Sequence, residues 1–274
     1  MAETEEIELI LLHMERIARA AGVILMDHLG QLKAEDVDFK GSRDLLTKAD
    51  RTSEEFIVAE IQRIFPNHDC LAEESGDHSG SNPAEDGFLW IVDPLDGTTN
   101  FVHQIPMFAV SLGVLHQGIP VAGCVFAPRL DELFLAGQGL GTTLNGVSVE
   151  VSKTTEMIDA MLSTGFAYKI DTLEDDNLDH FARLIKKTRA IRRCGSAALD
   201  MAYTACGRFD GFWELHLSPW DVAGGAVLIR EAGGEVTDLD GGENWLYGGE
   251  IVAGNATLAQ ALRQELRKAG EKQR

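Results

Sequence analysis

Basic residues are scarce in this sequence, which has 24 Lys and Arg against 44 Asp and Glu in 274 residues and a formal net charge of −20. Affinity for the phosphate backbone of a duplex depends on clustered Lys and Arg, so we expect no general nucleic-acid binder. Cysteine is scarce as well, and no C-x-x-C pair suggests a zinc or redox site. We expect the four cysteines to be small buried hydrophobic residues: Cys70, Cys124, Cys194 and Cys206.

Long apolar runs are also missing. No segment approaches the roughly 18 apolar residues of a membrane span, and the first six residues are acidic where a signal peptide would be basic. We therefore expect a cytoplasmic protein without a membrane partner. With 45% hydrophobic and 25% charged residues, the composition is typical of a globular protein with a buried core, in one large domain or two smaller ones that share a cleft.

Two helices are predicted in the first part of the chain. Apolar residues recur at three- and four-residue steps from Ile7 to Leu25, which predicts an amphipathic helix that ends near Gly30. A second helix is expected to follow Ser53 and to stop at Pro66, because proline cannot continue a helix. A polar loop over residues 40–44 lies between them.

From residue 88 the pattern indicates β-structure and then alternation. Segments rich in β-branched and aromatic residues predict consecutive antiparallel strands at 88–93, 108–115, 121–126 and 132–136. After residue 151 we expect strands at 161–164, 190–193, 211–214, 235–237 and 251–253, and helices at 175–187, 196–206, 219–232 and from 256. The fold class is therefore α/β, with an N-terminal α+β half over 1–151 and a C-terminal α/β half over 152–274.

Acidic residues follow strands or stand near helix starts at several places. Asp93 and Asp96 end the strand that begins at residue 88, although a charged turn with Asp96 as an N-cap explains these two equally well. Glu73 and Glu74 follow a short strand at 69–72, and Asp50 precedes a helix. Asp221, taken alone, is explained as the third-position acid of a capping box in Ser218-Pro219-Trp220-Asp221.

Several carboxylates that converge at such ends would repel one another unless cations neutralise them. Hard oxygen ligands without His or Cys suit Mg²⁺, and the eight histidines show no zinc-ligand spacing. The Gly97-Thr98-Thr99 turn offers backbone N–H groups to an anion. Carboxylates that can bind metal ions, next to backbone amides that can bind phosphate, indicate that the reaction involves a phosphoryl group. No Cys-x₅-Arg motif or Ser-His-Asp order is present, which favours direct attack by water over a covalent intermediate.

Two long motifs resemble the signatures of the inositol monophosphatase family: Asp93-Pro94-Leu95-Asp96-Gly97-Thr98-Thr99-Asn100-Phe101 and Trp220-Asp221-Val222-Ala223-Gly224-Gly225. They lie in the family's order, with Glu73-Glu74 upstream. The resemblance implies a layered α/β/α/β/α sandwich of the inositol monophosphatase and fructose-1,6-bisphosphatase type. It also implies a homodimer and sensitivity to lithium.

The resemblance further assigns roles to individual residues. It implies two to three Mg²⁺ ions per subunit, the first held by Glu73, Asp93 and the Leu95 carbonyl. The second is held by Asp93, Asp96 and Asp221, and a weaker third ion touches Glu73. Asp50 and Thr98 orient the attacking water, together with the catalytic metal ligand Glu73. The substrate-binding positions are the phosphate cradle and the alcohol side of the pocket: Gly97, Thr98, Gly195, Ser196, Ala197, Glu214 and Asp221.

The resemblance implies a small-molecule substrate, myo-inositol monophosphate, but related enzymes with the same metal-binding core leave other substrates open. These are fructose 1,6-bisphosphate, histidinol phosphate and 3′-phosphoadenosine nucleotides. A regulatory binding protein that retains the fold is the alternative of a different class. The basic cluster from Lys186 to Arg193 fits a helix C-terminus and a subunit interface. A second substrate phosphate, or a protein or RNA partner, is the other interpretation.

Overall fold

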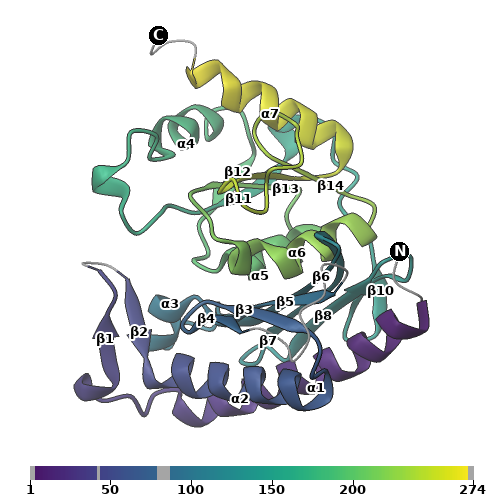
Figure 1. Cartoon of the computed structure of the whole chain (residues 1–274). Helices are drawn as coiled ribbons and strands as arrows, with labels where there is room; N and C mark the ends of the chain where they lie inside the picture. Colours follow the sequence, from purple (N-terminus) through teal and green to yellow (C-terminus); the bar gives the residue numbers. More distant parts are fainter. Residues whose placement is uncertain (1–3, 42–43, 79–86, 271–274) are drawn as a thin grey trace.

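The computed structural model describes residues 4–41, 44–78 and 87–270. Helices and sheets alternate in five layers, so that a large sheet lies between two helix layers and a smaller sheet lies above the second of these (Figure 1). This arrangement confirms the expected α/β/α/β/α sandwich. Residues 42 and 43 of the predicted polar loop lie outside the described residues. Within the described ranges, no helix has the length and apolar character that crossing a bilayer demands.

The helices form three layers. One outer layer holds α1 and α2, the central layer holds α5 and α6, and the other outer layer holds α4 and α7 (Figure 1). The α-helices are α1 Thr4–His28, α2 Lys48–Ile64, α3 Thr98–Val102, α4 Leu178–Leu184, α5 Ala197–Ala205, α6 Pro219–Glu231 and α7 Ala256–Gly270. The described residues also form short 3₁₀-helices, namely η1 Ala34–Asp36, η2 Met157–Asp159 and η3 Ile170–Thr172.

The large sheet has the strand order β10-β9-β8-β7-β6-β5-β3-β4, and β5 to β8 form the predicted antiparallel series. Its strands are β3 Asp69–Ala72, β4 Gly76–His78, β5 Phe88–Asp96, β6 Ala109–His116, β7 Ile119–Ala127, β8 Glu132–Gly137, β9 Gly141–Leu144 and β10 Val147–Val149. A two-stranded sheet pairs β1 Val37–Phe39 with β2 Leu45–Thr47.

The smaller sheet has the order β12-β11-β13-β15-β14. Its strands are β11 Met161–Thr164, β12 Ala190–Arg192, β13 Gly211–Leu215, β14 Glu235–Thr237 and β15 Glu250–Gly254. A hydrophobic core that includes residues from both sheets surrounds α5 and α6 between them. The two predicted halves therefore share buried surface, and the boundary after Val151 stays a prediction.

Three predicted helix boundaries are wrong, namely the start of α2 and both ends of α4. Helix α2 begins at Lys48, because Thr47 caps it: the Ala49 N–H donates to Thr47 Oγ1 at 3.1 Å, and the Thr47 N–H donates to Asp50 Oδ2 at 2.9 Å. Asp50 therefore lies in the first turn of the helix and does not precede it. Helix α4 covers Leu178–Leu184 rather than 175–187, because the left-handed backbone of Asn177 (φ 70°) breaks the helical path before it.

Candidate active site

The acidic residues of the site come from neighbouring chain ends. Strands β3 and β5 are parallel neighbours, so Glu73, which follows β3, lies at the same sheet edge as the end of β5. The Glu73 N–H donates to the Val92 carbonyl at 3.1 Å. The pairing of β5 with β6 shifts in register between Asp93 and Asp96. In a regular strand these two acids would point to opposite faces, so this irregularity lets both serve one site.

Asp50 is joined to the first motif by Thr98. The Thr98 hydroxyl lies 3.0 Å from Asp50 Oδ1 and 3.1 Å from the Leu95 carbonyl oxygen, and it is placed to donate to either. Burial raises the pKa of Asp50 to about 6, although hydrogen bonds from Thr47 and Thr98 favour the charged form. The structure therefore brings together the predicted Asp50 and Thr98 pair, in a buried position.

Asp93 is almost wholly buried, with 2% of its surface exposed. Burial and the negative charges of Glu73, Asp96 and Asp221 raise its pKa well above the usual value, while the Leu95 N–H donates to Asp93 Oδ1 at 3.0 Å. Such mutual repulsion shows that the four predicted metal-binding carboxyls lie within electrostatic reach of one another.

Asp96 connects the first motif to α5. Its Oδ2 accepts hydrogen bonds from the Ser196 hydroxyl and the Ala198 N–H, both at 2.7 Å. Burial raises the pKa of Asp96 to about 6 against the effect of these two bonds. Asn100 makes a second connection, because its side-chain amide donates to the carbonyls of Cys194 at 2.9 Å and Gly195 at 3.3 Å. The 194–198 segment is thereby fixed against the first motif.

Asp221 is held by the start of α6. The capping box is confirmed: the Ser218 N–H donates to Asp221 Oδ2 at 2.7 Å, with Pro219 in the first turn. Gly224 lets α6 lie directly on the large sheet, since a Cβ there would stand 2.7 Å from the Leu112 carbonyl oxygen. Burial and the charge of Asp96 raise the pKa of Asp221 well above the usual value. The second motif thus places its acid through close backbone packing.

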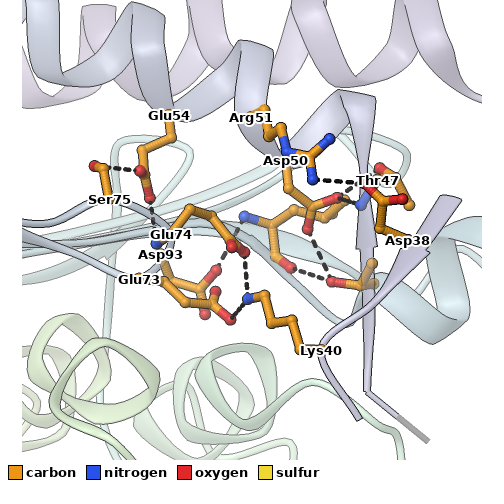
Figure 2. A network of polar contacts seen from close by, with 12 residues as sticks. Asp38, Lys40, Thr47, Asp50, Arg51, Glu54, Glu73, Glu74, Ser75 and Asp93 are labelled. Carbon is orange, nitrogen blue, oxygen red and sulfur yellow. Dashed lines mark hydrogen bonds and ion pairs between the residues drawn. The ribbon is translucent and has the colours of Figure 1, made fainter. Parts of the chain in front are cut away.

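Lys40 brings a cation to the acidic edge of the site. Its ammonium group lies 2.9 Å from Glu73 Oε1 and 2.5 Å from Glu74 Oε1, and Figure 2 shows it between the two glutamates and below Asp93. Burial alone would lower the pKa of Lys40, but Glu73 and Glu74 raise it above its usual value. Glu54 holds the same loop, because it accepts from the Glu74 N–H at 2.8 Å. Lys40 is therefore an internal counter-charge for the acidic edge.

A cavity of about 440 Å³ opens beside these acids. It is lined by seven of the predicted site residues: Glu73, Asp96, Gly195, Ser196, Ala197, Glu214 and Asp221. The other five are buried behind it or beside it: Asp50, Asp93, Leu95, Gly97 and Thr98. The structure therefore gathers every predicted residue at one end of β5 and around one cavity.

Glu214 and Asp200 form the acidic part of the cavity away from the first motif. Glu214 is 8% exposed and lies inside β13, so it is not an acid in open solvent. Burial and the charges of Asp200, Asp221 and Asp96 raise the pKa of Glu214 well above the usual value. Burial also raises the pKa of Asp200 to about 8, and Asp200 Oδ1 has no hydrogen-bond partner within the described part of the chain.

Sequence reasoning gave Lys40 and Asp200 no role in the site and named Arg193 only as part of the basic cluster, yet all three line the cavity. A signal existed for Asp200 only, because it stands four residues after the N-cap Ser196 and so near the same end of α5. Among residues 4–41, 44–78 and 87–270, no three His, Cys, Asp or Glu side chains are arranged, as they stand, to hold one metal ion. The assignment of metal ligands therefore stays a prediction.

Comparison with known proteins gives consistent results. Residues 6–271 match the model of the inositol monophosphatase family. The chain is 43% identical to a protein named Nus factor SuhB from Pseudomonas aeruginosa, over 90% of this chain and 92% of that protein. It is 40% identical to inositol-1-monophosphatase of Mesorhizobium japonicum, with 93% and 95% covered. The solved extragenic suppressor protein suhB of Bartonella henselae superposes with a TM-score of 0.89 at 38% identity, covering 95% of this chain and 99% of that one.

Proposed function

The chain belongs to the inositol monophosphatase family, and we propose that it is a Mg²⁺-dependent phosphomonoesterase that hydrolyses myo-inositol monophosphate or a similar polyol phosphate. One observation carries the proposal: Glu73 after β3, Asp96 at the end of β5 and Asp221 at the start of α6 line a single cavity, and their charges raise the pKa of the buried Asp93. Such a concentration of buried negative charge is typical of a site that binds cations.

The donor set fits Mg²⁺, because it offers carboxylate and carbonyl oxygens without His or Cys. We assign the ions to Glu73, Asp93, the Leu95 carbonyl, Asp96 and Asp221. Bound Mg²⁺ would lower the pKa of a water molecule and stabilise charge on the departing oxygen. A general base alone contributes ~10²–10⁴ of an acceleration that reaches up to ~10²¹ for phosphate monoesters, so the base cannot account for the reaction.

Thr98 and Asp50 are suited to orient the attacking water and to receive its proton. When the Thr98 hydroxyl donates to Asp50, its oxygen lone pairs can accept a hydrogen bond from water. A base works best when its pKa lies near the working pH, and the Asp50 pKa of about 6 meets that condition. Thr47 keeps Asp50 in place through its N–H and its hydroxyl.

The phosphate and the alcohol are assigned to different sides of the cavity. The amides of Gly97 and Thr98 begin α3 and have no partner inside that helix, so they are suited to phosphate oxygens. The left-handed backbone of Gly97 (φ 95°) makes this turn possible. Glu214 and the 195–197 segment line the other part, where a carboxylate can accept hydrogen bonds from hydroxyls of the substrate.

Phosphate release from a panel of substrates tests this proposal. The panel contains inositol 1-phosphate, fructose 1,6-bisphosphate, histidinol phosphate, a 3′-phosphoadenosine nucleotide and 4-nitrophenyl phosphate, each with and without Mg²⁺. We expect Mg²⁺-dependent release that is fastest with inositol 1-phosphate and that Li⁺ inhibits. No release from any member at saturating Mg²⁺ contradicts the phosphatase proposal, whereas another preferred member corrects only the substrate. Light scattering of the purified protein tests the proposed homodimer.

A second candidate function is binding of RNA through the basic cluster. We consider it because several relatives carry the name Nus factor SuhB. All five of its basic side chains are exposed: Lys186, Lys187, Arg189, Arg192 and Arg193. Lys187 and Arg189 form surface ion pairs with Glu265 and Asp159, which salt readily screens. Fluorescence anisotropy with single-stranded RNA at two salt concentrations tests this function. Binding that Arg192→Glu abolishes would support it, and no binding at low salt would contradict it.

A further inference from the structure

Asn177 is a helix-capping residue whose side chain does not cap its helix. It stands at the N-cap position of α4, where asparagine usually accepts a hydrogen bond from the first turn, and no such bond is present. Asp176 accepts from the Leu178 N–H instead, at 3.0 Å. The Asn177 side chain turns inward, and only 2% of the residue is exposed. The Asn177 side chain therefore forms its hydrogen bonds elsewhere than in the helix.

The buried amide of Asn177 joins the end of β11 to β13 in the smaller sheet. Its Nδ2 donates to Thr164 Oγ1 at 2.9 Å and to the Gly165 carbonyl at 2.8 Å, while its Oδ1 accepts from Trp213 Nε1 at 2.7 Å. The indole N–H is only a donor, so it fixes which end of the amide faces Trp213. Thr164 and Trp213 are partners in the parallel pair of β11 and β13. Asn177 thus fixes the backbone at Gly165 relative to β13.

Gly165 lies against the carboxyl group of Glu214. A Cβ at position 165 would stand 2.1 Å from Glu214 Oε1 and 2.4 Å from Oε2, which is far inside contact distance. Gly165 does not have the left-handed backbone that would require glycine, and a side chain here would have to displace the carboxyl group of Glu214. Trp213 and Glu214 point to opposite faces of β13, so the indole is buried in the core while the carboxyl reaches the cavity.

We propose that Asn177 and Gly165 are positioning residues that set which alcohol the cavity accepts, because together they fix the carboxyl group of Glu214. Gly165 supplies the space that the carboxyl occupies, and Asn177 fixes the backbone that borders this space. Glu214 itself accepts no hydrogen bond from the described residues, so contact with this backbone defines where its oxygens stand. The consequence for selectivity rests on the proposed phosphatase function, but the positioning of Glu214 does not.

Asn177→Asp removes the two donated hydrogen bonds with almost no change of shape. We expect kcat/KM for inositol 1-phosphate to fall about tenfold, and to fall clearly less for 4-nitrophenyl phosphate, which has no hydroxyls for Glu214 to bind. Asn255→Asp is the matched control, because Asn255 also donates twice to carbonyls and accepts once from an N–H, at the start of α7. The control should lower stability without changing the ratio of the two substrates.

A double-variant comparison shows whether Asn177 acts through Glu214. In a Glu214→Gln background, Asn177→Asp should change the substrate ratio no further, and Trp213→Phe should reproduce part of its effect in the wild-type background. An equal loss on both substrates, or the same additional loss in the Glu214→Gln background, would overturn the proposal, since either result indicates general damage to the fold.

Thermal unfolding tests the positioning without any activity measurement. Gly165→Ala should lower the melting temperature of the wild-type chain and lower it much less in a Glu214→Ala chain, where the opposing carboxyl is gone. Equal losses in both backgrounds would overturn the positioning of Glu214 by Gly165. If the wild-type chain hydrolyses no member of the panel, the phosphatase proposal fails by itself, and the unfolding experiment still decides the positioning.

Discussion

The two sides of the cavity are built differently. On the side of the first motif each carboxylate has its own hydrogen-bond donors: Thr47 and Thr98 for Asp50, Ser196 and Ala198 for Asp96, and Ser218 for Asp221. On the alcohol side, Glu214 accepts no hydrogen bond from the described residues and Asp200 has one oxygen without a partner. The first side is preorganised by direct bonds, and the second side by the backbone behind it.

This difference indicates a division of labour. Groups that must act on the phosphate in every reaction are held rigidly, because a small displacement of a catalytic group lowers the reaction rate strongly. Carboxyls without fixed partners keep their acceptor capacity for a ligand, and buried unpaired acceptors discriminate strongly against ligands that cannot satisfy them. We therefore propose that one side carries out the reaction and that the other selects the alcohol. The predictions below can break this division.

The largest effect is expected from Asp93→Asn. The variant should lose more than about a thousandfold in turnover, because the central acid no longer carries the charge that we assign to both ions. It should also melt at a higher temperature in EDTA, since the raised pKa of Asp93 shows that its buried charge costs stability. Phosphate release at saturating Mg²⁺ and thermal unfolding measure the two effects. Turnover within about tenfold of wild type would remove Asp93 from the mechanism.

A smaller loss is expected from Thr98→Ala. Without the hydroxyl, Asp50 loses a buried donor and the water loses its orienting group, so kcat should fall about a hundredfold on every substrate. Thr98→Ser keeps the hydroxyl and should recover most of the activity. Failure of the serine variant to recover, at unchanged stability, would indicate that the threonine methyl group matters and not the hydrogen bond.

The sequence predicted the fold better than it predicted the helix starts. The 3.6-residue pattern of α1 and the boundaries of β11 and β14 are confirmed, because their apolar residues face cores on the expected side. The capping box at Ser218 was recognised and the one at Thr47 was not, although both use the same spacing. The late start of α4 depends on Asn177, whose tertiary hydrogen bonds no local pattern contains.

Some residues of the site could be predicted from the sequence and others could not. The first and second motifs identified Asp93, Asp96 and Asp221, because a contiguous run of residues carries their geometry. Lys40 lies more than thirty residues from Glu73 in sequence, and Asp200 meets Glu214 only through the packing of α5 on β13. Contacts of this kind depend on how separate elements pack, so one sequence alone does not reveal them.

An intermediate effect is expected from Glu214→Gln, on the alcohol side alone. The kcat/KM for inositol 1-phosphate should fall by about 1.5–3 kcal/mol of transition-state stabilisation, the range for a hydrogen bond to a charged group. Hydrolysis of 4-nitrophenyl phosphate should fall less, because it lacks the hydroxyls. Steady-state kinetics on both substrates measure the difference. Equal losses would mean that Glu214 supports the ions or the fold, and the division between the two sides would fail.

The smallest effect concerns stability, and Asp200→Asn tests whether the alcohol side holds an uncharged carboxyl. Burial raises the pKa of Asp200 from its usual 3.8 to about 8, so between these values the folded chain binds a proton that the unfolded chain releases. Wild-type stability should therefore decline as the pH rises from about 4 to about 8, and asparagine removes this dependence. Relative to wild type, the variant should gain about 1–3 kcal/mol between pH 5 and pH 8.

Thermal unfolding of both proteins across this pH range measures the gain, which should appear as a rise of several degrees in the difference of melting temperatures. Asp159→Asn is the control, because the Asp159 carboxyl is more than half exposed and its ion pair with Arg189 lies at the surface. The control should show no comparable pH dependence. A pH-independent difference for Asp200→Asn would mean that Asp200 stays ionised when folded. Glu214 would then face a second negative charge. Arg193, which lines the cavity and whose charge favours the ionised form of both acids, would have to compensate for it.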